Sequence, residues 1–345
     1  MGNIGKNMKI DVIIPIYKPG RQLFALLEKL QGQTVPIGNI ILMNTGRKYF
    51  EQLVSGMNFE ERYPNVKVCH LSKREFDHGG TRHEGVQRSD GEAFVVMTQD
   101  AMPVDDRLIE KLTEGLSDGA AVSYARQLPR PDASEYEKLT RAFNYPENSK
   151  VKTAADLEHM GIKTFFCSNV CAAYRRDVYE ELGGFIRHTI FNEDMIFAAK
   201  AVKAGWGIAY AAEAKVVHSH NYTNLMQLRR NFDLGVSQAD HPEVFGAAAS
   251  EAEGKRLVTE AWRYFGKKGI LYRFPGFCLQ CCFKYAGYLL GKHYERLPRG
   301  LVLRITTNRE YWERQDRDEE KVRAVVRHKK MEAVKNISME IEEKD

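Results

Sequence analysis

An acidic residue, Asp100, closely follows a short apolar run. Residues 93–97 read Ala-Phe-Val-Val-Met, which predicts a buried strand. In open α/β sheets, ligands bind beyond the carboxyl ends of the strands. Asp is also favoured in turns and at helix N-termini, and Pro103 indicates that a helix begins soon after, so Asp100 alone would suggest a structural role. Polar groups follow the other predicted strands as well, and together they predict a site for a metal-bound diphosphate.

Two histidines extend this prediction. His218 and His220 are separated by one residue, and side chains i and i+2 of a strand point the same way. With Asp100 they form a carboxylate and imidazole set that suits Mg²⁺ or Mn²⁺. Zinc fits less well, because no further Cys or His completes a set. The common alternative is one buried structural histidine beside an exposed one.

A pair of carboxylates, Glu193 and Asp194, opens another predicted helix. The helix dipole stabilises negative charge there, so capping would explain the pair. Asn192 could supply the cap instead. One of the two acids would then be free to face the cleft as a general base.

Residues 78–82 read His-Gly-Gly-Thr-Arg. They combine a flexible turn, a helix N-terminus and a guanidinium, which are the groups that bind phosphate. The alternative is a glycine turn with a solvent-facing Arg82. The position after a predicted strand favours phosphate binding.

The elements that must position these groups alternate between strand and helix. Strands are predicted at 9–17, 39–43, 66–71, 93–97 and 120–125, with helices at about 19–30, 49–57, 80–89 and 105–116. This alternation predicts an α/β fold with a mainly parallel central sheet that is covered by helices on both faces.

The pattern changes after residue 128. Residues 128–164 are polar, contain prolines and are weakly periodic, which predicts a functional loop or lid. Order resumes with predicted strands at 166–174, 207–211 and 214–217 and helices at 175–182 and 194–203. After Asn224 the chain is predicted to be helical, and it ends in a tail rich in Glu and Lys.

Composition sets the broad class. The chain has 345 residues, of which 43% are hydrophobic and 28% charged, as in ordinary globular proteins. Residues 1–9 do not resemble a signal peptide, and no apolar stretch approaches the ~20 residues of a spanning helix, so we expect a cytoplasmic protein. Cys278 and Cys281 have a zinc-knuckle spacing without a second pair, so the six cysteines are expected to be reduced thiols.

The net charge of +5 is unevenly distributed. Residues 263–309 hold ten Lys and Arg against one acid, and eight Tyr and Phe are interleaved with them from Tyr264 to Tyr288. Basic and aromatic residues together favour the headgroup region of anionic lipid. No nucleic-acid-binding module accompanies the window, so we expect no nucleic acid partner. The predicted partner is the inner leaflet of the membrane, and a solvated helical surface is the alternative.

Nine short segments, taken in their order along the chain, resemble the family-2 nucleotide-sugar glycosyltransferases of GT-A fold, and within them the bacterial rhamnosyltransferase-like branch. The resemblance covers about residues 8–237. The segments that carry it are Val12–Tyr17, Asn44–Gly46, Phe76–Arg82, Thr98–Pro103, Ser168–Arg176, Gly183–Phe185, Asn192–Met195, His218–Tyr222 and Arg230–Val236. Ala101 and Met102 follow Asp100, where a second carboxylate is common in the family.

The resemblance implies roles for individual residues. The donor nucleotide sugar would contact Pro15, Tyr17, Asn44, Thr45, His78, Gly79, Gly80, Arg82, Gln99 and Asp100. Asp194 would be the catalytic base. Asn169, Glu193, Arg229 and Arg230 would contact the acceptor or phosphate. A divalent cation, Mg²⁺ or Mn²⁺, would be held by Asp100 with His218 or His220.

The activity implied is that of an inverting glycosyltransferase. It would move L-rhamnose from dTDP-L-rhamnose to a saccharide or lipid-linked acceptor of a bacterial surface polysaccharide. Asp194 would deprotonate the acceptor hydroxyl, while metal and Arg82 stabilise the departing nucleotide diphosphate. The alternatives are a UDP-hexose donor, a non-catalytic nucleotide-sugar or membrane-interaction module, and a metallohydrolase built on His218 and His220.

The expected organisation is a GT-A catalytic domain at 8–237 and a helical, basic-aromatic extension at 238–345. The nucleotide-binding half would cover about 8–126 and the acceptor half about 127–237. Localisation would be cytoplasmic and peripheral on the inner face of the cell membrane.

Overall fold

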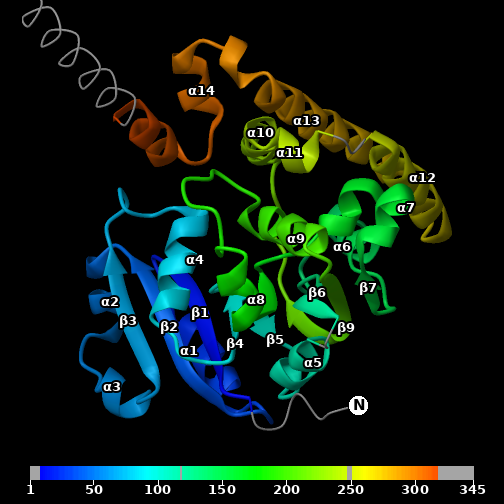
Figure 1. The fold of residues 1–345 in the computed structure, drawn as a ribbon. Coiled ribbons are helices and arrows are strands. Elements are labelled where there is room, and N and C mark those ends of the chain that lie inside the picture. The colour runs from blue at the N-terminus through cyan, green and yellow to red at the C-terminus, as the bar shows by residue number, and fades with distance from the viewer. Residues whose placement is uncertain (1–7, 117–118, 247–250, 318–345) are drawn as a thin grey trace, which may run out of the picture.

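The structure is a computed structural model that describes residues 8–116, 119–246 and 251–317. Its centre is one nine-stranded sheet, in which eight strands follow the order β3-β2-β1-β4-β8-β6-β9-β5 and β7 pairs with β9 (Figure 1). The charged tail predicted at the C-terminal end lies outside the described residues.

The N-terminal half of the sheet is parallel, as the alternating pattern predicted. Its strands are β1 (Ile10–Tyr17), β2 (Ile37–Thr45), β3 (Val66–Leu71) and β4 (Ala93–Met97). The helices between them are α1 (Gln22–Gln31), α2 (Arg47–Val54), α3 (Phe59–Arg62) and α4 (His78–Gln87).

The other half makes the whole sheet mixed, which the prediction of a mainly parallel sheet missed. Strand β8 (Cys171–Arg175) inserts antiparallel between β4 and β6 (Ala120–Leu128), while β9 (Gly207–Val217) is parallel to β6. The short strands β5 (Met102–Pro103) and β7 (Lys150–Lys152) pair antiparallel with β9. Local periodicity cannot show this order, because it depends on pairing between distant segments.

Helices cover both faces of the sheet, because successive strand residues point to opposite sides. Ile10, Val12 and Ile14 of β1 pack into one core with α1, α3 and α5 (Leu108–Glu114). Ile13 packs into the second core with α4, α8 (Arg176–Glu181) and α9 (Glu193–Lys203).

Two local predictions were wrong. The segment predicted to be an irregular loop or lid, 128–164, contains α6 (Glu135–Asn144), β7, α7 (Leu157–Met160) and two short 3-10 helices. Helix α6 is capped by Ser134 but buries only Leu139, so its periodicity is weak. The two strands predicted at 207–217 are one strand with a register shift opposite Ala125 and Arg126.

The C-terminal region is helical, as predicted, and from here on the extension means its described residues 224–317. Its helices are α10 (Asn224–Asp240), α11 (Pro242–Phe245), α12 (Glu251–Lys267), α13 (Phe274–Lys292) and α14 (Arg299–Ile305). The expected domain boundary at residue 237 falls inside α10, and the division into domains stays a prediction.

Helices α10 and α13 pack against each other through glycines. A Cβ added to Gly287 would lie 2.1 Å from the carbonyl oxygen of Leu228, and one added to Gly291 would lie 2.1 Å from that of Phe232. Gly235 makes the reciprocal approach to Tyr288. Side chains at these positions would separate the two helices.

None of the described helices is long and apolar enough to cross a membrane. All six cysteines are free thiols.

Candidate active site

A cavity of about 560 Å³ lies where the ends of β4, β6 and β9 face α6, α9 and the extension. It collects Asp100, Asn169, Glu193, Asp194 and Arg230, together with His78, Arg82, His218 and His220, from the residues that the sequence singled out. Arg229 is exposed and is not among the residues that line the described cavities.

Asp100, His218 and His220 form a candidate metal site, and they are the one such group among the described residues. The Nε2 atoms of the two histidines are 3.2 Å apart, and Asp100 Oδ2 is 3.2 Å from His220 Nε2. Two ligands at about 2.1 Å from a metal and roughly at right angles to each other are separated by about 3 Å. The donor set therefore fits a divalent cation.

Gln127, which the sequence reasoning did not single out, fixes the orientation of His218. Its Nε2 donates to Tyr145 Oη at 2.5 Å and to Ser168 Oγ at 2.9 Å, and its Oε1 accepts from Arg141. The His218 Nδ1, 3.0 Å from Oε1, must then carry the proton. This leaves the Nε2 lone pair directed at the metal site, which is the usual way that metal-binding histidines are oriented.

The electrostatics also suit a cation. Burial lowers the pKa of His218 to about 3, so its imidazole is neutral and able to ligate. Burial alone would raise the pKa of Asp100, but hydrogen bonding to His220 and the proximity of His218 lower it below its usual range. Asp100 is therefore a carboxylate at neutral pH.

Glu193 and Asp194 begin helix α9. Asn192 has a left-handed backbone (φ 63°) and its side chain does not cap the helix; its Nδ2 instead donates to Ser237 Oγ at 3.2 Å. The alternative that Asn192 provides the cap is therefore wrong. Asp194 accepts from the backbone N–H of Asn169 at 2.9 Å and from that of Met195 at 2.8 Å.

The two neighbouring carboxylates have opposite electrostatic environments. Glu193 Oε1 lies 3.3 Å from Arg82 Nη1 and accepts from Asn169 Nδ2 at 3.0 Å. Although burial opposes it, Arg82 lowers the pKa of Glu193. Burial and the charge of Glu193 raise the pKa of Asp194. Asp194 is thus the member of the pair that suits proton transfer near neutral pH.

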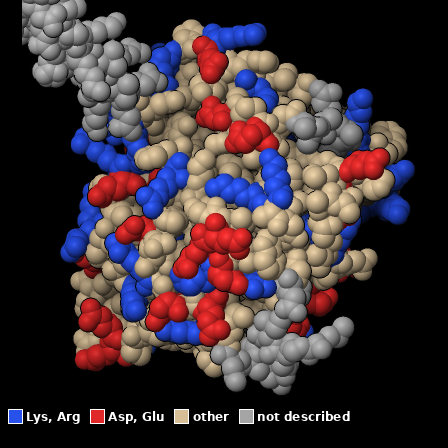
Figure 2. All heavy atoms as spheres, in the orientation of Figure 1, with Lys and Arg blue, Asp and Glu red and all other residues tan. Residues whose placement is uncertain are grey.

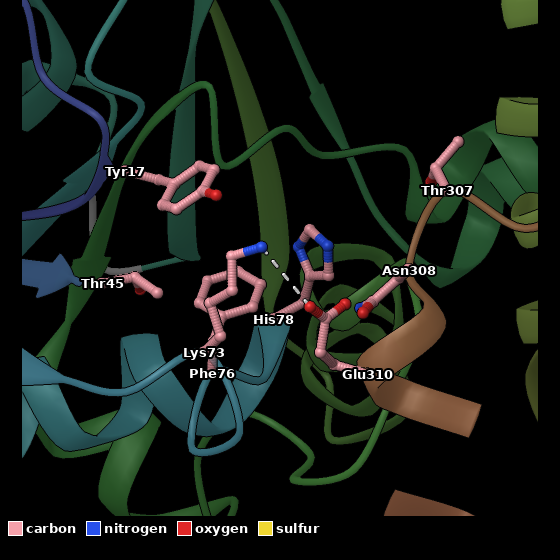
Figure 3. Close-up of a pocket in the computed structure, with 8 residues that line it drawn as sticks. All are labelled: Tyr17, Thr45, Lys73, Phe76, His78, Thr307, Asn308 and Glu310. Atoms are coloured by element: carbon pink, nitrogen blue, oxygen red, sulfur yellow. Dashed lines mark ion pairs between the residues drawn. The ribbon is translucent and has the colours of Figure 1, made fainter. Parts of the chain in front are cut away.

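A second cavity, of about 270 Å³, lies at the ends of β1 and β2 (Figure 3). Tyr17, Thr45 and His78 line it. Thr45 Oγ1 and the nearby Asn44 Oδ1 are buried without a hydrogen-bond partner in the described structure. A polar atom without a protein partner can be satisfied by a ligand or by water. His78 lines both cavities, so it lies where they meet.

The remaining predicted donor contacts have structural roles. Gln99 exchanges two hydrogen bonds with the backbone of Tyr17, at 3.0 and 3.1 Å, and so ties β1 to the segment after β4. Pro15 pairs with Met43 inside the sheet. Gly79 and Gly80 lie in the first turn of α4, and a Cβ on Gly79 would lie 1.8 Å from the carbonyl oxygen of Ile186. Whether these residues also contact a donor stays a prediction.

The extension contributes to the main cavity, which the sequence did not indicate. Lys284 of α13 lines it with Gln238 of α10, and burial lowers the pKa of Lys284. Within the described part of the chain Lys284 makes no hydrogen bond or ion pair, although Glu137 and Arg141 lie within electrostatic range. Arg230 stacks on Phe191, 4.7 Å from the ring centre, at the same cavity.

Comparison with known proteins agrees with this fold and identifies the family. The family model described as glycosyl transferase family 2 matches residues 11–183. The O-antigen chain rhamnosyltransferase RfbN of Salmonella typhimurium is 38% identical over 88% of this chain and 96% of that protein. The O-antigen chain rhamnosyltransferase WbaN of Salmonella anatum is 36% identical over 87% and 95%.

A solved structure supports the fold. The mannosyltransferase PcManGT from Pyrobaculum calidifontis, in complex with GDP-Man and Mn²⁺, superposes with a TM-score of 0.56 over 84% of this chain and 88% of that chain, at 13% identity. The fold and the family match together define the class, a glycosyltransferase of GT-A fold. The chain belongs to glycosyl transferase family 2.

Proposed function

We propose that the protein transfers L-rhamnose from dTDP-L-rhamnose to a lipid-linked saccharide acceptor in O-antigen synthesis, with inversion at the anomeric carbon. One observation carries the mechanism: a single cavity holds both a candidate cation site and a buried carboxylate of raised pKa. The choice of sugar and pathway is supported by the names of two relatives that match nearly full length.

The donor would lie across His78. Its nucleoside would occupy the cavity of Figure 3, and its diphosphate would reach the candidate cation site in the main cavity. Asp100, His218 and His220 would hold Mg²⁺ or Mn²⁺, which neutralises charge on the leaving diphosphate. Arg82 and Arg230 line the same cavity, and Arg230 is more exposed and freer to contact phosphate, because Arg82 is paired with Glu193.

Asp194 would act as general base. It would remove the proton from the acceptor hydroxyl as that oxygen attacks the anomeric carbon and the bond to the diphosphate breaks. A single displacement of this kind inverts the configuration. Asn169 would hold both carboxylates in place through its backbone N–H and its side-chain amide.

The acceptor would be reached at the inner face of the cell membrane, where the protein would bind peripherally from the cytoplasm. Exposed aromatic and apolar side chains of the extension support this, among them Trp262 and Tyr272, which are 54% and 73% exposed. Lys267 and Arg273 are exposed beside them and complement anionic lipid.

A panel of nucleotide sugars tests the function. We expect transfer from dTDP-L-rhamnose to a lipid-linked saccharide, and transfer from a UDP-hexose alone would establish the alternative donor. The variant Asp194→Asn should lose about 100-fold or more in turnover, while its donor dissociation constant stays near that of the wild type, because the base acts on the acceptor.

The control for this substitution is Asp106→Asn, which makes the same change at an exposed position outside the cavity. Full turnover by Asp194→Asn would remove Asp194 from the mechanism.

A further inference from the structure

Residues 306–314 of the extension run along the smaller cavity to the loop between β3 and α4. We call this segment the C-terminal strap. One end is fixed by Asp233 of α10, which is buried. Its carboxylate accepts from Thr306 Oγ1 at 2.7 Å and from the backbone N–H of Thr307 at 2.8 Å, and also from the Thr307 hydroxyl. The strap therefore begins at a defined position on the extension.

The other end of the strap is bound to the loop between β3 and α4. Arg314 donates to the carbonyl oxygens of Arg74 and Phe76, both at 2.6 Å, and lies 3.6 Å from Asp77. Trp312 between the two ends is buried in the core of the extension. Both ends being fixed, the residues between them are held over the cavity.

Asn308 and Glu310 of the strap form one wall of the cavity, opposite Tyr17 and Thr45 (Figure 3). Glu310 lies 3.6 Å from Lys73, which belongs to the same loop between β3 and α4. This pair is exposed by 36% and 56%, so it contributes little energy. It indicates proximity of strap and loop rather than a strong closure.

Asn308 has one polar group available for a ligand. Its Oδ1 accepts from the backbone N–H of Tyr311 at 3.2 Å, as an N-cap of the helical turn that follows. Its Nδ2 has no protein partner among the described residues and lies at the cavity. An amide N–H₂ pairs with an oxygen acceptor, and the base carbonyls of thymine and uracil are such acceptors.

We propose that the C-terminal strap completes the nucleoside pocket of the donor and that Asn308 Nδ2 donates to a carbonyl oxygen of its pyrimidine base. This rests on the proposed use of a nucleotide-sugar donor. Thr45 lines the opposite side of the cavity, and its Oγ1, which has no hydrogen-bond partner in the described structure, would offer a further polar contact to the same nucleoside. The extension, which lies beyond the matched family segment, thereby takes part in donor selection.

The test is direct binding of dTDP and of inorganic pyrophosphate, each with Mg²⁺, to the full chain. Asn308→Ser keeps an N-capping residue but removes the amide donor. We expect it to weaken dTDP binding about tenfold, the effect of losing one hydrogen bond, and to leave pyrophosphate binding unchanged. Arg309→Ala, an exposed neighbour outside the cavity, is the control and should bind both probes like the wild type.

Hydrogen exchange gives a second readout, since dTDP should slow exchange of amides in the strap and pyrophosphate should not. Equal dTDP affinity of Asn308→Ser and wild type, with exchange in the strap unaffected by dTDP, would overturn the proposal. Tighter binding of GDP than of dTDP or UDP by the wild type would also overturn it. Failure of the wild type to bind any nucleotide diphosphate would instead refute the proposed function.

Discussion

Adjacent carboxylates that share one buried site can be given different tasks by their neighbours. In this protein Arg82 compensates the charge of Glu193, and Glu193 in turn disfavours a second charge on Asp194. The arrangement keeps one acid ionised and makes the other a stronger base. Removing the charge of Glu193 should therefore change the protonation of Asp194.

We expect Glu193→Gln to move the acidic limb of the pH profile of kcat to lower pH. Loss of the negative neighbour, and the unpaired charge of Arg82, both favour ionised Asp194, so its pKa falls and the base is active at lower pH. The measurement is kcat from pH 5 to 9 at saturating substrates. Glu180→Gln, at an exposed carboxylate of α8, is the control. An unchanged acidic limb would show that Glu193 does not affect the group whose titration limits kcat.

Gln127 should matter to cation binding although it is not a ligand. Gln127→Leu removes the acceptor that orients His218, and second-shell changes of this kind typically weaken metal binding by about 10- to 100-fold. Binding of Mn²⁺ to the nucleotide-free protein measures the effect. Gln33→Leu removes another buried amide, which bonds to Lys29, Asp105 and Ile109 away from the cavity, and should leave Mn²⁺ binding intact.

Equal Mn²⁺ affinity of Gln127→Leu and wild type would contradict the orienting role. If the wild type also keeps full turnover in excess EDTA, the whole cation assignment fails, and Asp100 becomes a direct contact to the sugar or a structural group.

The sequence was sufficient to select the candidate metal-site residues but not the residues that orient them. Asp100, His218 and His220 were predicted to form one site because each follows a strand, and the structure brings them together. Gln127 also lies at a strand end, but the predicted strand stopped at residue 125, which left Gln127 outside every predicted element. Its role depends on four partners that are distant in sequence, and no local pattern contains that information.

At the scale of elements, the same glycine can serve packing or binding. The turn before α4 was predicted to bind phosphate, but the structure gives Gly79 a packing reason, because α4 approaches the carbonyl oxygen of Ile186 there. The alternation of strands and helices predicted the parallel half of the sheet well. The antiparallel insertion of β8 between β4 and β6 could not be predicted, because it depends on pairing between strands that are distant in sequence.

Helix α13 brings a partly buried cation, Lys284, to the cavity, and this has an energetic cost. An unpaired ammonium loses hydration without gaining a partner. We therefore expect Lys284→Met to leave the melting temperature unchanged or to raise it, while the KM for the acceptor rises several-fold and the KM for the donor does not. An anionic group of the acceptor would be the missing partner.

The control is Lys267→Met on α12, an exposed position outside the cavity. Unchanged acceptor KM in Lys284→Met would show that Lys284 does not contact the acceptor.

At the scale of the whole molecule, the basic window is less uniform than its composition implied. Arg263, Lys268 and Arg299 are each paired with an acid, and Lys284 faces the cavity. On the face shown in Figure 2, basic and acidic side chains are interspersed. The proposed membrane binding would therefore depend on the exposed apolar side chains on and between α12 and α13 as well as on charge. They are Trp262, Leu271, Tyr272, Leu279, Tyr285 and Leu289.

We expect the protein to sediment with anionic liposomes and to bind neutral ones weakly. Each cation near the surface contributes about 1 kcal/mol at most, and salt screens it, so binding should fall as salt rises. The double variant Lys267→Glu and Arg273→Glu should lose most of this binding. Arg21→Glu with Lys29→Glu, at exposed positions at and near the ends of α1, makes the same charge change and should bind like the wild type.

Fluorescence of Trp262 should shift to the blue on binding, since its side chain is half exposed in the free protein. Equal partitioning of both double variants into anionic and neutral liposomes would show that the extension is a solvated surface.

The glycine contact between α10 and α13 determines where related enzymes can be recombined. Helix α10 follows the two histidines, carries Asp233 for the strap, and fits α13 through backbone approaches that tolerate no side chain. A hybrid that joins residues up to 237 of one enzyme to the later helices of another would bring together helix surfaces that do not fit each other. Exchange at Thr223, where α10 is capped, keeps α10 with its glycine partner α13, so the transplanted unit retains this packing and the Asp233 contacts to the strap.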